Sequence, residues 1–445
     1  MARRAAPRHR ASASQRREPG SKPRQSPKRS QPPAKRREPA SERRAAPSDR
    51  RKPPSPRRAV ASARREPRSQ PPAVASERHE RAAERGASAS ERRAAAPTAA
   101  PRAVATRDHH PARLTRADSP VGATTTVDIP RDVADAELDV GGRVVKLTNL
   151  TKVFWPDEGI TKGDLVRYYA GMAPILLPHV RDRAMVMKRY PNGATGEFFF
   201  MKRAPSPRPP WIETCSIEHS SGNVIDFPMI NDLAALLWVI NLGCIDLNEW
   251  YARCDDVDRP DYLHFDLDPG EEVGFPQVVE TAHVVDETLR NLGMSTYAKT
   301  TGSRGIHVYV PIVRGPTQKD VWTTAKTISL DIARRHPRLT TAVYRKEIRP
   351  RDRVHVDFNQ NAWGRTLASV YSVRPRPRAP VSTPVTWDEL RRPIAIDEFR
   401  IDNVPARVKR LGDLWVPVTA ESRRGRFDLA TLLEPATRPR SPRPR

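Results

Sequence analysis

The chain has 445 residues and a formal net charge of +26, and this charge is unevenly distributed. Residues 1–120 contain 32 Lys and Arg against 11 Asp and Glu, whereas the residues that follow are close to neutral. The first 120 residues contain no Trp, Tyr, Phe, Ile or Cys, so they cannot bury enough apolar surface to offset the loss of chain entropy on folding. We therefore predict that residues 1–125 form a disordered basic arm rich in Arg, Pro, Ala and Ser.

Such an arm attracts nucleic-acid phosphates with little sequence preference, and salt weakens that attraction. A solubilising linker without a binding role is the alternative hypothesis. Residues 421–445, which are also rich in Arg and Pro, are predicted to form a shorter basic tail.

Cellular compartment is indicated by cysteine usage and hydropathy. The three cysteines form no C-x-x-C pair, which argues against a zinc site or a disulfide framework and is typical of a reducing cytoplasm. The N-terminus lacks the apolar stretch of a secretory signal, and the most apolar segment, Ile230–Gly243, is too short to span a bilayer. We expect a cytoplasmic protein without membrane contact.

Between the basic segments, residues 128–420 are predicted to form an α/β domain with two packed sheets flanked by helices. In chain order we expect a strand at Arg143–Leu147, a helix from the cap Thr161 to Leu177, a strand at Ala184–Met187, a helix from the cap Asn231 to Gly243, a strand at Tyr262–Phe265, helices at Pro276–Leu292 and Lys319–Arg335, and a strand at Val354–Val356.

The loop before the first helix contains Asn149 and Lys152, and Lys162 follows the cap. Two lysines and an amide near a helix start can hold a terminal phosphate. Ordinary solvated lysines are the alternative.

A basic turn and an aromatic run follow the second strand. Lys188 begins the turn KRYPNG, where its ammonium can face phosphates or simply solvent. Glu197–Lys202 places Phe199 and Phe200 beside basic residues, the pattern of single-strand binders that combine stacking with charge. A buried strand explains the same pattern, and strand alternation would then bury one of these two rings and expose the other.

Three carboxylates lie on two of the predicted strands. Asp266 and Asp268 are two residues apart on a strand, so both side chains point to one face and can reach one divalent ion. Asp357 ends the run that begins at Val354 and would complete a site for hard cations such as Mg²⁺ or Mn²⁺. Each element alone is weak evidence, because D-x-D and strand-end aspartates are common.

The segment Thr301–His307 reads TGSRGIH and is predicted to be a phosphate-binding turn. Its glycines allow a tight turn and close approach of the backbone. Ser303, Arg304 and backbone N–H groups can bind phosphate oxygens, and His307 begins the next strand. A plain hairpin turn is the alternative.

Taken together and in this order, these segments resemble the polymerase domain of bacterial DNA ligase D, in the archaeo-eukaryotic primase superfamily. The resemblance covers about residues 140–418 and is carried by VKLTNLTKVFWP, KRYPNG, FDLDPG, TGSRGIHVY, and VDFNQN followed by YSVR. It implies a primase-type polymerase fold. No ligase or phosphoesterase motif is seen, so a stand-alone family member is expected.

The resemblance implies a role for each candidate residue. Asp266, Asp268 and Asp357 would be catalytic and bind the metals. The nucleotide phosphates would contact Ser303, Arg304, His307 and Arg374, to which the basic turn adds Lys188 as a candidate contact to the phosphates or the template backbone. A downstream 5′-phosphate would bind Asn149, Lys152 and Lys162, and the template would stack on Phe199 and Phe200.

Two positions depart from the family pattern. The family usually has Lys where Arg304 stands, so a point donor becomes a planar fork. Asn248 stands where related domains often carry His near the catalytic centre, and an amide cannot carry a proton or a positive charge.

By this resemblance we expect template-dependent nucleotidyl transfer that fills short gaps at DNA breaks, in non-homologous end joining or related repair. The expected cofactors are two Mn²⁺ or Mg²⁺ ions, the substrates are NTPs or dNTPs, and the partners are DNA, Ku and a separate ligase. The expected location is a bacterial cytoplasm, near the nucleoid.

Two other functions remain open. A non-catalytic DNA end-binding or bridging protein would use the same 5′-phosphate pocket. A metal-dependent nuclease could use D-x-D with a distal Asp, but the phosphate-binding turn favours transfer from a triphosphate.

Overall fold

The computed structural model describes residues 113–115, 127–219, 221–395, 397–420 and 422–433. Its larger sheet has six strands in the order β14-β15-β11-β13-β12-β17. These strands are β11 (Tyr262–Pro269), β12 (Tyr297–Thr300), β13 (Ile306–Pro311), β14 (Thr340–Thr341), β15 (Val354–Asp357) and β17 (Pro384–Val385).

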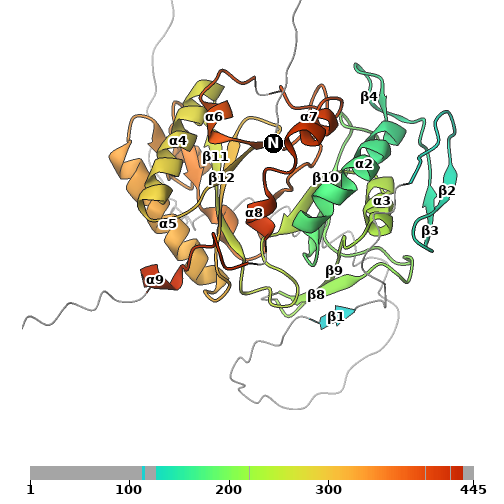
Figure 1. Cartoon of the computed structure of the whole chain (residues 1–445), viewed down its shortest axis with the longest axis horizontal. Coiled ribbons are helices and arrows are strands. Elements are labelled where there is room, and N and C mark those ends of the chain that lie inside the picture. Colours follow the sequence, from blue (N-terminus) through green and yellow to red (C-terminus); the bar gives the residue numbers. More distant parts are fainter. Residues whose placement is uncertain (1–112, 116–126, 220, 396, 421, 434–445) are drawn as a thin grey trace, which may run out of the picture. The chain divides into compact units, whose positions relative to one another are not determined.

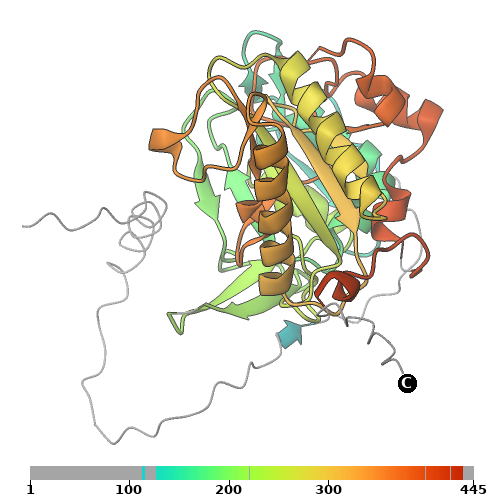
Figure 2. The ribbon, with the colours of Figure 1, turned by 90° about the vertical axis from the view of Figure 1, so that its left-hand side faces the viewer.

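Two long helices, α4 (Phe275–Asn291) and α5 (Gln318–Arg335), lie side by side across one face of this sheet (Figures 1 and 2). The helix α5 begins at a capping box in which Thr317 and Asp320 satisfy each other's backbone N–H groups. Apolar residues at helical spacing, such as Val278, Ala282 and Val285, are fully buried against the strands. The opposite face of the sheet is therefore left for the polar residues of its central strands.

The second sheet has four strands in the order β16-β10-β6-β7. These are β6 (Met185–Arg189), β7 (Phe199–Met201), β10 (Cys244–Trp250) and β16 (Thr366–Ala368). The helices α2 (Lys162–Val180) and α3 (Leu233–Asn241) pack against each other, and α3 also contacts β10 (Figure 1). The expected α/β fold with two sheets flanked by helices is thus confirmed.

Short elements complete the domain. Two two-stranded sheets are formed by β2 (Ala136–Asp139) with β3 (Val144–Leu147) and by β4 (Val153–Trp155) with β5 (Ile160–Thr161). The hairpin of β8 (Thr214–Glu218) and β9 (Val224–Pro228) belongs to a three-stranded sheet. The remaining turns and helices are η1 (Lys346–Ile348), η2 (Asn359–Asn361), α6 (Trp387–Leu390), α7 (Val404–Leu411), α8 (Val416–Thr419) and α9 (Ala430–Leu433).

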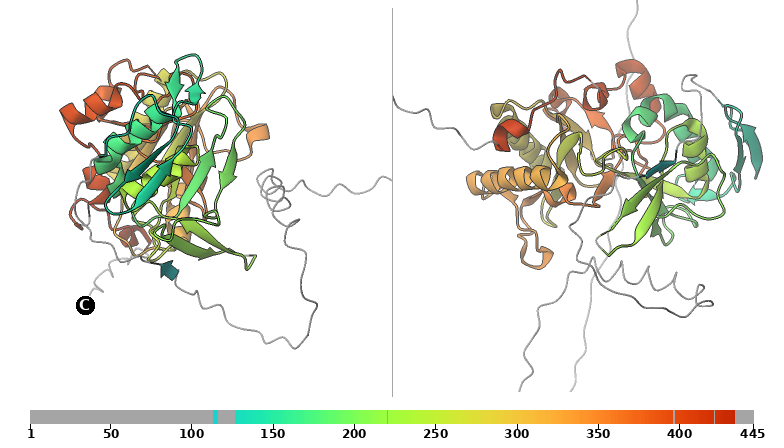
Figure 3. Two further views of the ribbon diagram at one scale, coloured as in Figure 1. Left: turned by 90° about the vertical axis from the view of Figure 1, so that its right-hand side faces the viewer. Right: turned by 90° about the horizontal axis from the view of Figure 1, so that it is seen from below.

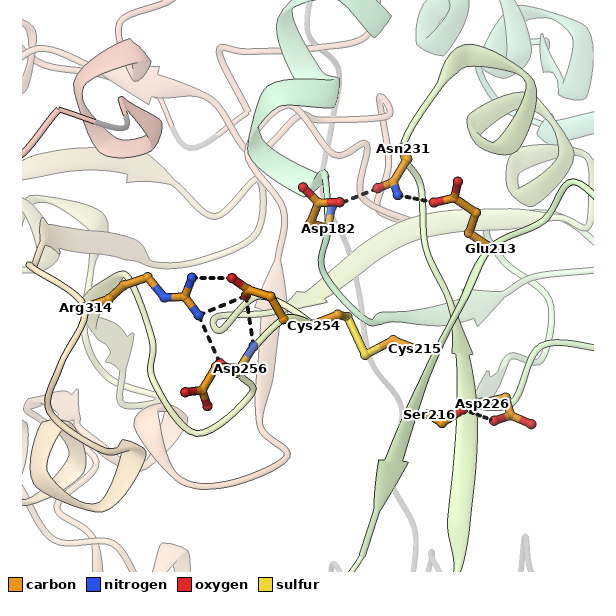
Figure 4. The surroundings of a disulfide bond; sticks show 10 residues. Asp182, Glu213, Cys215, Ser216, Asp226, Asn231, Cys254, Asp256 and Arg314 are labelled. Carbon is orange, nitrogen blue, oxygen red and sulfur yellow. Dashed lines mark hydrogen bonds and ion pairs between the residues drawn. A yellow bond between two sulfur atoms is a disulfide. The ribbon is translucent and has the colours of Figure 1, made fainter. Parts of the chain in front are cut away.

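The β8–β9 hairpin forms a small second core with the four-stranded sheet (Figure 3). Phe227 of β9 packs on Trp250 of β10, and a disulfide joins Cys215 of β8 to Cys254, with 5.9 Å between their Cα atoms (Figure 4). The expectation that the cysteines form no disulfide is wrong. They lie 39 residues apart in sequence, and only the packing of the hairpin brings them together. Cys244 is free and buried.

Two helix boundaries also differ from those expected. Pro178 does not end α2, which continues to Val180. A proline costs the helix one backbone hydrogen bond, and the burial of His179 and Val180 offsets that loss. Asn231 does not cap α3; Asp232 does, accepting from the Ala235 amide at 2.9 Å. The Asn231 side chain instead accepts from the Asp182 amide and donates to Glu213 (Figure 4).

Short segments at both ends of the described chain pair with the domain. Within the predicted arm, the strand β1 (Arg113–Thr115) pairs antiparallel with β8. Residues 1–112, 116–126 and 434–445 lie outside the described residues, so the disordered arm stays a prediction. At the other end, Phe427 pairs with the backbone of Pro311 and Val313, and Leu429 is fully buried. The fold therefore extends beyond the boundary placed at residue 420.

No helix in the described part of the chain is both long and apolar enough to cross a membrane.

A buried ion pair joins the residues just before β6 of the four-stranded sheet to those just before β11 of the six-stranded sheet. Arg183, just before β6, donates to both carboxylate oxygens of Asp261, just before β11, at 2.7 Å. Neither residue is more than 2% exposed, and the Arg183 guanidinium lies 4.8 Å from the Tyr262 ring centroid. Nearby Arg183 and Arg253 hold the pKa of Asp261 below its ordinary value despite its burial.

We predict that Asp261→Ala lowers the free energy of unfolding by about 3–5 kcal/mol, because it leaves the charged Arg183 buried without its partner. Urea unfolding measures this loss. Asp331→Ala is the matched control: Asp331 pairs with Arg334 and Arg335 at the exposed surface of α5, where solvent screens the pair, so its loss should be much smaller than that of Asp261→Ala. Equal losses in the two variants would contradict the prediction.

Candidate functional site

The cross-strand register of β11 places four potential metal ligands on one face of the six-stranded sheet. Asp266 lies directly opposite Asp357, and Asp268 lies directly opposite His355. Directly opposed residues of an antiparallel pair point to the same face, as do residues two apart on one strand. These four side chains are called the ligand patch below.

Three members of the ligand patch are close enough to share an ion. One side-chain ligand atom from each of Asp268, His355 and Asp357 lies within 4.8 Å of the other two. Asp357 is oriented by the chain that follows it, accepting from the Asn359 amide at 2.7 Å and from the Gln360 amide group at 3.1 Å.

The ligand patch is electrostatically unfavourable without a cation. The negative charge of Asp266 is the main cause that raises the pKa of Asp268 to about 8, and burial adds to it. Burial is the main cause that raises the pKa values of Asp266 and Asp357 to about 6. Burial likewise lowers the pKa of His355 to about 3, which favours its neutral form. Carboxylates and a neutral imidazole are a donor set that fits divalent cations.

A chain of close polar contacts leads from Asp266 across the sheet to the second sheet. His307 Nε2 lies 3.1 Å from Asp266, and His307 Nδ1 lies 2.8 Å from Lys299 Nζ. Lys299 also donates to the Ala368 carbonyl of β16 at 2.8 Å and to Ser382 at 2.7 Å. A protonated Lys299 can only donate, so His307 Nδ1 accepts and its Nε2–H faces Asp266.

Burial governs the charges of this chain. It lowers the pKa of Lys299 to about 7 and, together with the charge of Lys299, holds the pKa of His307 well below its ordinary value. Both nitrogens of the expected phosphate ligand His307 are thus engaged within the protein.

The turn between β12 and β13 has the close approach expected for its glycines. Gly302 has φ +64°, and a Cβ there would lie 2.7 Å from Arg374 Cγ, while a Cβ on Gly305 would lie 2.4 Å from the Leu267 carbonyl oxygen. The amides of Ser303 and Gly305 both donate to Thr301 Oγ1. The side chains in this turn, rather than these two amides, are therefore available to phosphate.

Arginine side chains flank the turn. Arg304 is exposed and donates to the Gly270 carbonyl at 2.8 Å, and Ser303 is half-buried. Arg374 donates to the Thr301 carbonyl at 2.9 Å and pairs with Asp246 at 2.8 Å. Lys188 approaches the same carboxylate at 3.5 Å. Asp246 is 1% exposed, so this buried carboxylate keeps the side chains of Lys188 and Arg374 beside the turn.

The aromatic run is exposed. Phe199 and Phe200 are 44% and 57% exposed, so the alternative of a buried strand, which would have buried one of them, is wrong. The cause is that β7 is a three-residue edge strand whose rings pack over the cations of β6 instead of a core. The Lys188 ammonium lies 4.1 Å from the Phe198 ring centroid, and the Arg189 guanidinium lies 5.2 Å from that of Phe199.

The three residues of the expected 5′-phosphate pocket lie close together but differ in their exposure to solvent. Asn149 is exposed and has φ +55°. Two backbone hydrogen bonds connect the three residues: the Lys152 amide donates to the Asn149 carbonyl, and the Lys162 amide donates to the Lys152 carbonyl. The Lys152 ammonium is exposed and donates to the Pro191 carbonyl at 2.7 Å. Lys162 is 4% exposed and donates to Thr148 and Asn241, so it supports the loop.

Asn248 lies on β10, half-buried, and its amide donates to the Asp246 carbonyl at 3.2 Å.

Sequence reasoning missed three residues of the site. His355 had a usable signal, since it stands two positions before Asp357 on a strand. For Lys299 the only sequence signal was its position just before the turn. Asp246 had no sequence signal, because its partners come from β6 and from a segment more than 120 residues later.

Known proteins match the chain over this domain. Residues 161–415 match the family described as "LigD, primase-polymerase domain". A multifunctional non-homologous end joining protein LigD of Mycolicibacterium smegmatis is 35% identical over 280 residues, covering 62% of this chain and 36% of that protein. A bifunctional LigD of Bacillus subtilis is 27% identical over 270 residues, covering 60% of this chain and 43% of that protein.

A solved structure matches as well. The polymerase domain of Mycobacterium tuberculosis ligase D, in complex with DNA, has 32% sequence identity and a TM-score of 0.59. The match covers 62% of this chain and 99% of that chain.

We predict that Asp268→Asn stabilises the metal-free protein increasingly as pH rises. A carboxyl whose folded pKa is raised, here to about 8 from 3.8, destabilises the fold when it ionises, so stability is lost as pH rises between these values. Because Asp268 is partly exposed, we expect a gain of only about 1 kcal/mol, or about 2–4 °C in melting temperature.

Thermal unfolding in EDTA at pH 5 and pH 8 measures the difference, which should be larger at pH 8. Added Mn²⁺ should reverse the order, because the wild type keeps the ligand. A variant that is equally destabilised at both pH values would refute this account.

Proposed function

The chain belongs to the LigD primase-polymerase domain family, and from this premise we propose that it is a nucleotidyltransferase acting on DNA. Its reaction would be template-directed addition of nucleoside monophosphates from NTPs or dNTPs at short gaps in broken DNA. The observation that carries the proposal is the ligand patch lying beside a basic turn, because nucleotidyl transfer needs carboxylates for metals and cations for a triphosphate.

Asp266, Asp268 and Asp357 would hold two divalent cations, Mn²⁺ or Mg²⁺. The raised pKa values of these carboxylates support this role, since a bound cation relieves their mutual repulsion. Such ions, when bound, activate the primer 3′-hydroxyl and neutralise charge on the triphosphate and the leaving pyrophosphate. His307 would orient Asp266 through the 3.1 Å contact of its Nε2 with one carboxylate oxygen, which leaves the other carboxylate oxygen free to ligate.

Ser303, Arg304, Arg374 and Lys188 would bind the phosphates of the incoming nucleotide. Arg374 and Lys188 are held in place by the buried Asp246, so they need no reordering to face a ligand. His307 would contact a phosphate only by exchanging the bond from its Nε2 to Asp266. Arg304 offers a planar fork suited to two phosphate oxygens.

DNA would be bound at two further places. Lys152 and Asn149, on the loop that Lys162 supports, would hold a downstream 5′-phosphate. The exposed rings of Phe199 and Phe200 would stack against template bases, a contact worth about 1–3 kcal/mol per base. The DNA complex of the related M. tuberculosis domain supports DNA as the ligand.

The setting would be end joining of broken bacterial DNA, near the nucleoid. The related LigD proteins are end-joining proteins, and this chain spans little more than a third of the first of them. Ku and a separate DNA ligase would act with it. The basic arm, which lies outside the described residues, would add salt-dependent affinity for DNA.

We predict that the full chain extends a primer on a gapped, 5′-phosphorylated duplex with labelled NTP or dNTP and Mn²⁺. Asp266→Ala should reduce extension at least about 10³-fold, because removal of a metal ligand removes charge stabilisation in the transition state. Gel analysis of extended primers measures this. No extension by the wild type with any divalent metal would refute the polymerase and favour an end-binding protein. Full extension by Asp266→Ala would refute the site.

We predict that Lys152→Ala abolishes most of the preference for a 5′-phosphorylated over an unphosphorylated gap, with a roughly tenfold loss corresponding to about 1.4 kcal/mol. Fluorescence anisotropy with the two duplexes measures this ratio. Lys146→Ala is the matched control, because Lys146 is an exposed lysine that pairs with Glu137. The pocket is excluded if the ratio is unchanged in Lys152→Ala, or if Lys146→Ala lowers it equally.

A further inference from the structure

We propose that His355 is a nitrogen ligand of the cation held by Asp268 and Asp357, and that it makes this position prefer Mn²⁺ over Mg²⁺. The inference rests on the proposed metal-dependent function and specifies the ion at one of its two positions.

The burial and isolation of its imidazole single out His355. Its side chain is 0% exposed, and neither ring nitrogen has a hydrogen-bond partner among the described residues. A buried polar group left without a partner costs about 1–3 kcal/mol, so a folded protein seldom retains one without compensation.

The surroundings of His355 provide that compensation in the form of a cation site. Its β11 neighbour, directly opposite, is Asp268, and Asp357 is two residues along the same face. One ring nitrogen lies within 4.8 Å of an oxygen of each carboxylate. Two carboxylates and one imidazole on adjacent strands can therefore converge on a single ion.

The structure also gives the ion a route to the site. Asp268 is exposed, whereas His355 and Asp357 are buried. The position thus has one ligand at the surface and two inside, and a cation reaching Asp268 from solvent finds the imidazole next to it.

The nitrogen ligand decides which ion is preferred. Mg²⁺ favours six oxygen ligands in strict geometry and dehydrates reluctantly. Imidazole is a good ligand for the first-row transition ions, and Mn²⁺, although it also favours oxygen, belongs to that series and accepts an imidazole nitrogen more readily than Mg²⁺ does. Replacing one oxygen by nitrogen should therefore weaken Mg²⁺ binding relative to Mn²⁺. Asp266, which lies directly opposite Asp357 in the ligand patch, offers carboxylate oxygens for the second ion.

His264 shows that burial alone does not make such a site. Its ring is also buried with both nitrogens unpartnered among the described residues, but it stacks on Tyr309, with 5.1 Å between ring centroids. It belongs to no carboxylate cluster in the described part of the chain. His264→Phe is therefore the matched control for His355→Gln.

The test uses the full-length chain loaded with Mn²⁺ and no nucleotide or DNA. Electron spin-echo envelope modulation detects ¹⁴N bound directly to Mn²⁺, and competition by Mg²⁺ for the bound Mn²⁺ gives the ratio of affinities. We expect a ¹⁴N signal in the wild type and in His264→Phe, and its loss in His355→Gln. The preference for Mn²⁺ over Mg²⁺ should fall about tenfold in His355→Gln, whose amide offers oxygen instead of nitrogen.

Each contrary result has a distinct meaning. Bound Mn²⁺ without a ¹⁴N signal in the wild type, or a signal that persists in His355→Gln, would overturn the role of His355 while leaving the polymerase proposal intact. Failure to bind Mn²⁺ at all would overturn the metal-dependent function as well. Thermal unfolding in EDTA verifies that the variants fold, and His355→Leu replaces His355→Gln if the latter does not.

Discussion

The site depends on the register in which β11 pairs with its neighbours β15 and β13. This register sets Asp266 opposite Asp357 and His307, and Asp268 opposite His355. A slip of one residue would turn every ligand to the other face of the sheet. The alternate residues of β11, Phe265 and Leu267, are fully buried, so the same apolar packing that stabilises the sheet also fixes the positions of its ligands.

Burial of the ligand patch opposes the stability of the metal-free protein. Asp266 and Asp357 are buried, and their burial raises their pKa values, while the charge of Asp266 is the main cause that raises the pKa of the more exposed Asp268. Lys299 offsets part of this repulsion through its charge, and its hydrogen bonds tie the centre to the Ala368 carbonyl of the second sheet. A change in the packing of the two sheets would therefore move Lys299 and His307 and so alter the position of Asp266.

The second sheet positions cations in the same way, by a buried anion. Asp246 holds Arg374 and Lys188, which come from segments far apart in sequence. The rings of Phe198, just before β7, and of Phe200 in β7 lie close to the Lys188 ammonium. One short edge strand thus joins a stacking surface to the phosphate-facing cations, which explains why its aromatic side chains stay exposed.

The sequence by itself determined the α/β class, the segments that carry the chemistry, and the pairing of Asp266 with Asp268 on one face, because strand alternation and glycine turns are local properties. Only the tertiary structure decided that His355 joins the carboxylates, that Asp246 holds two cations, that Phe199 and Phe200 are both exposed, and that Cys215 meets Cys254. These features depend on which strands become neighbours and which strand is left at an edge. Neither is a local property, since both follow from the burial of apolar faces contributed by distant parts of the chain.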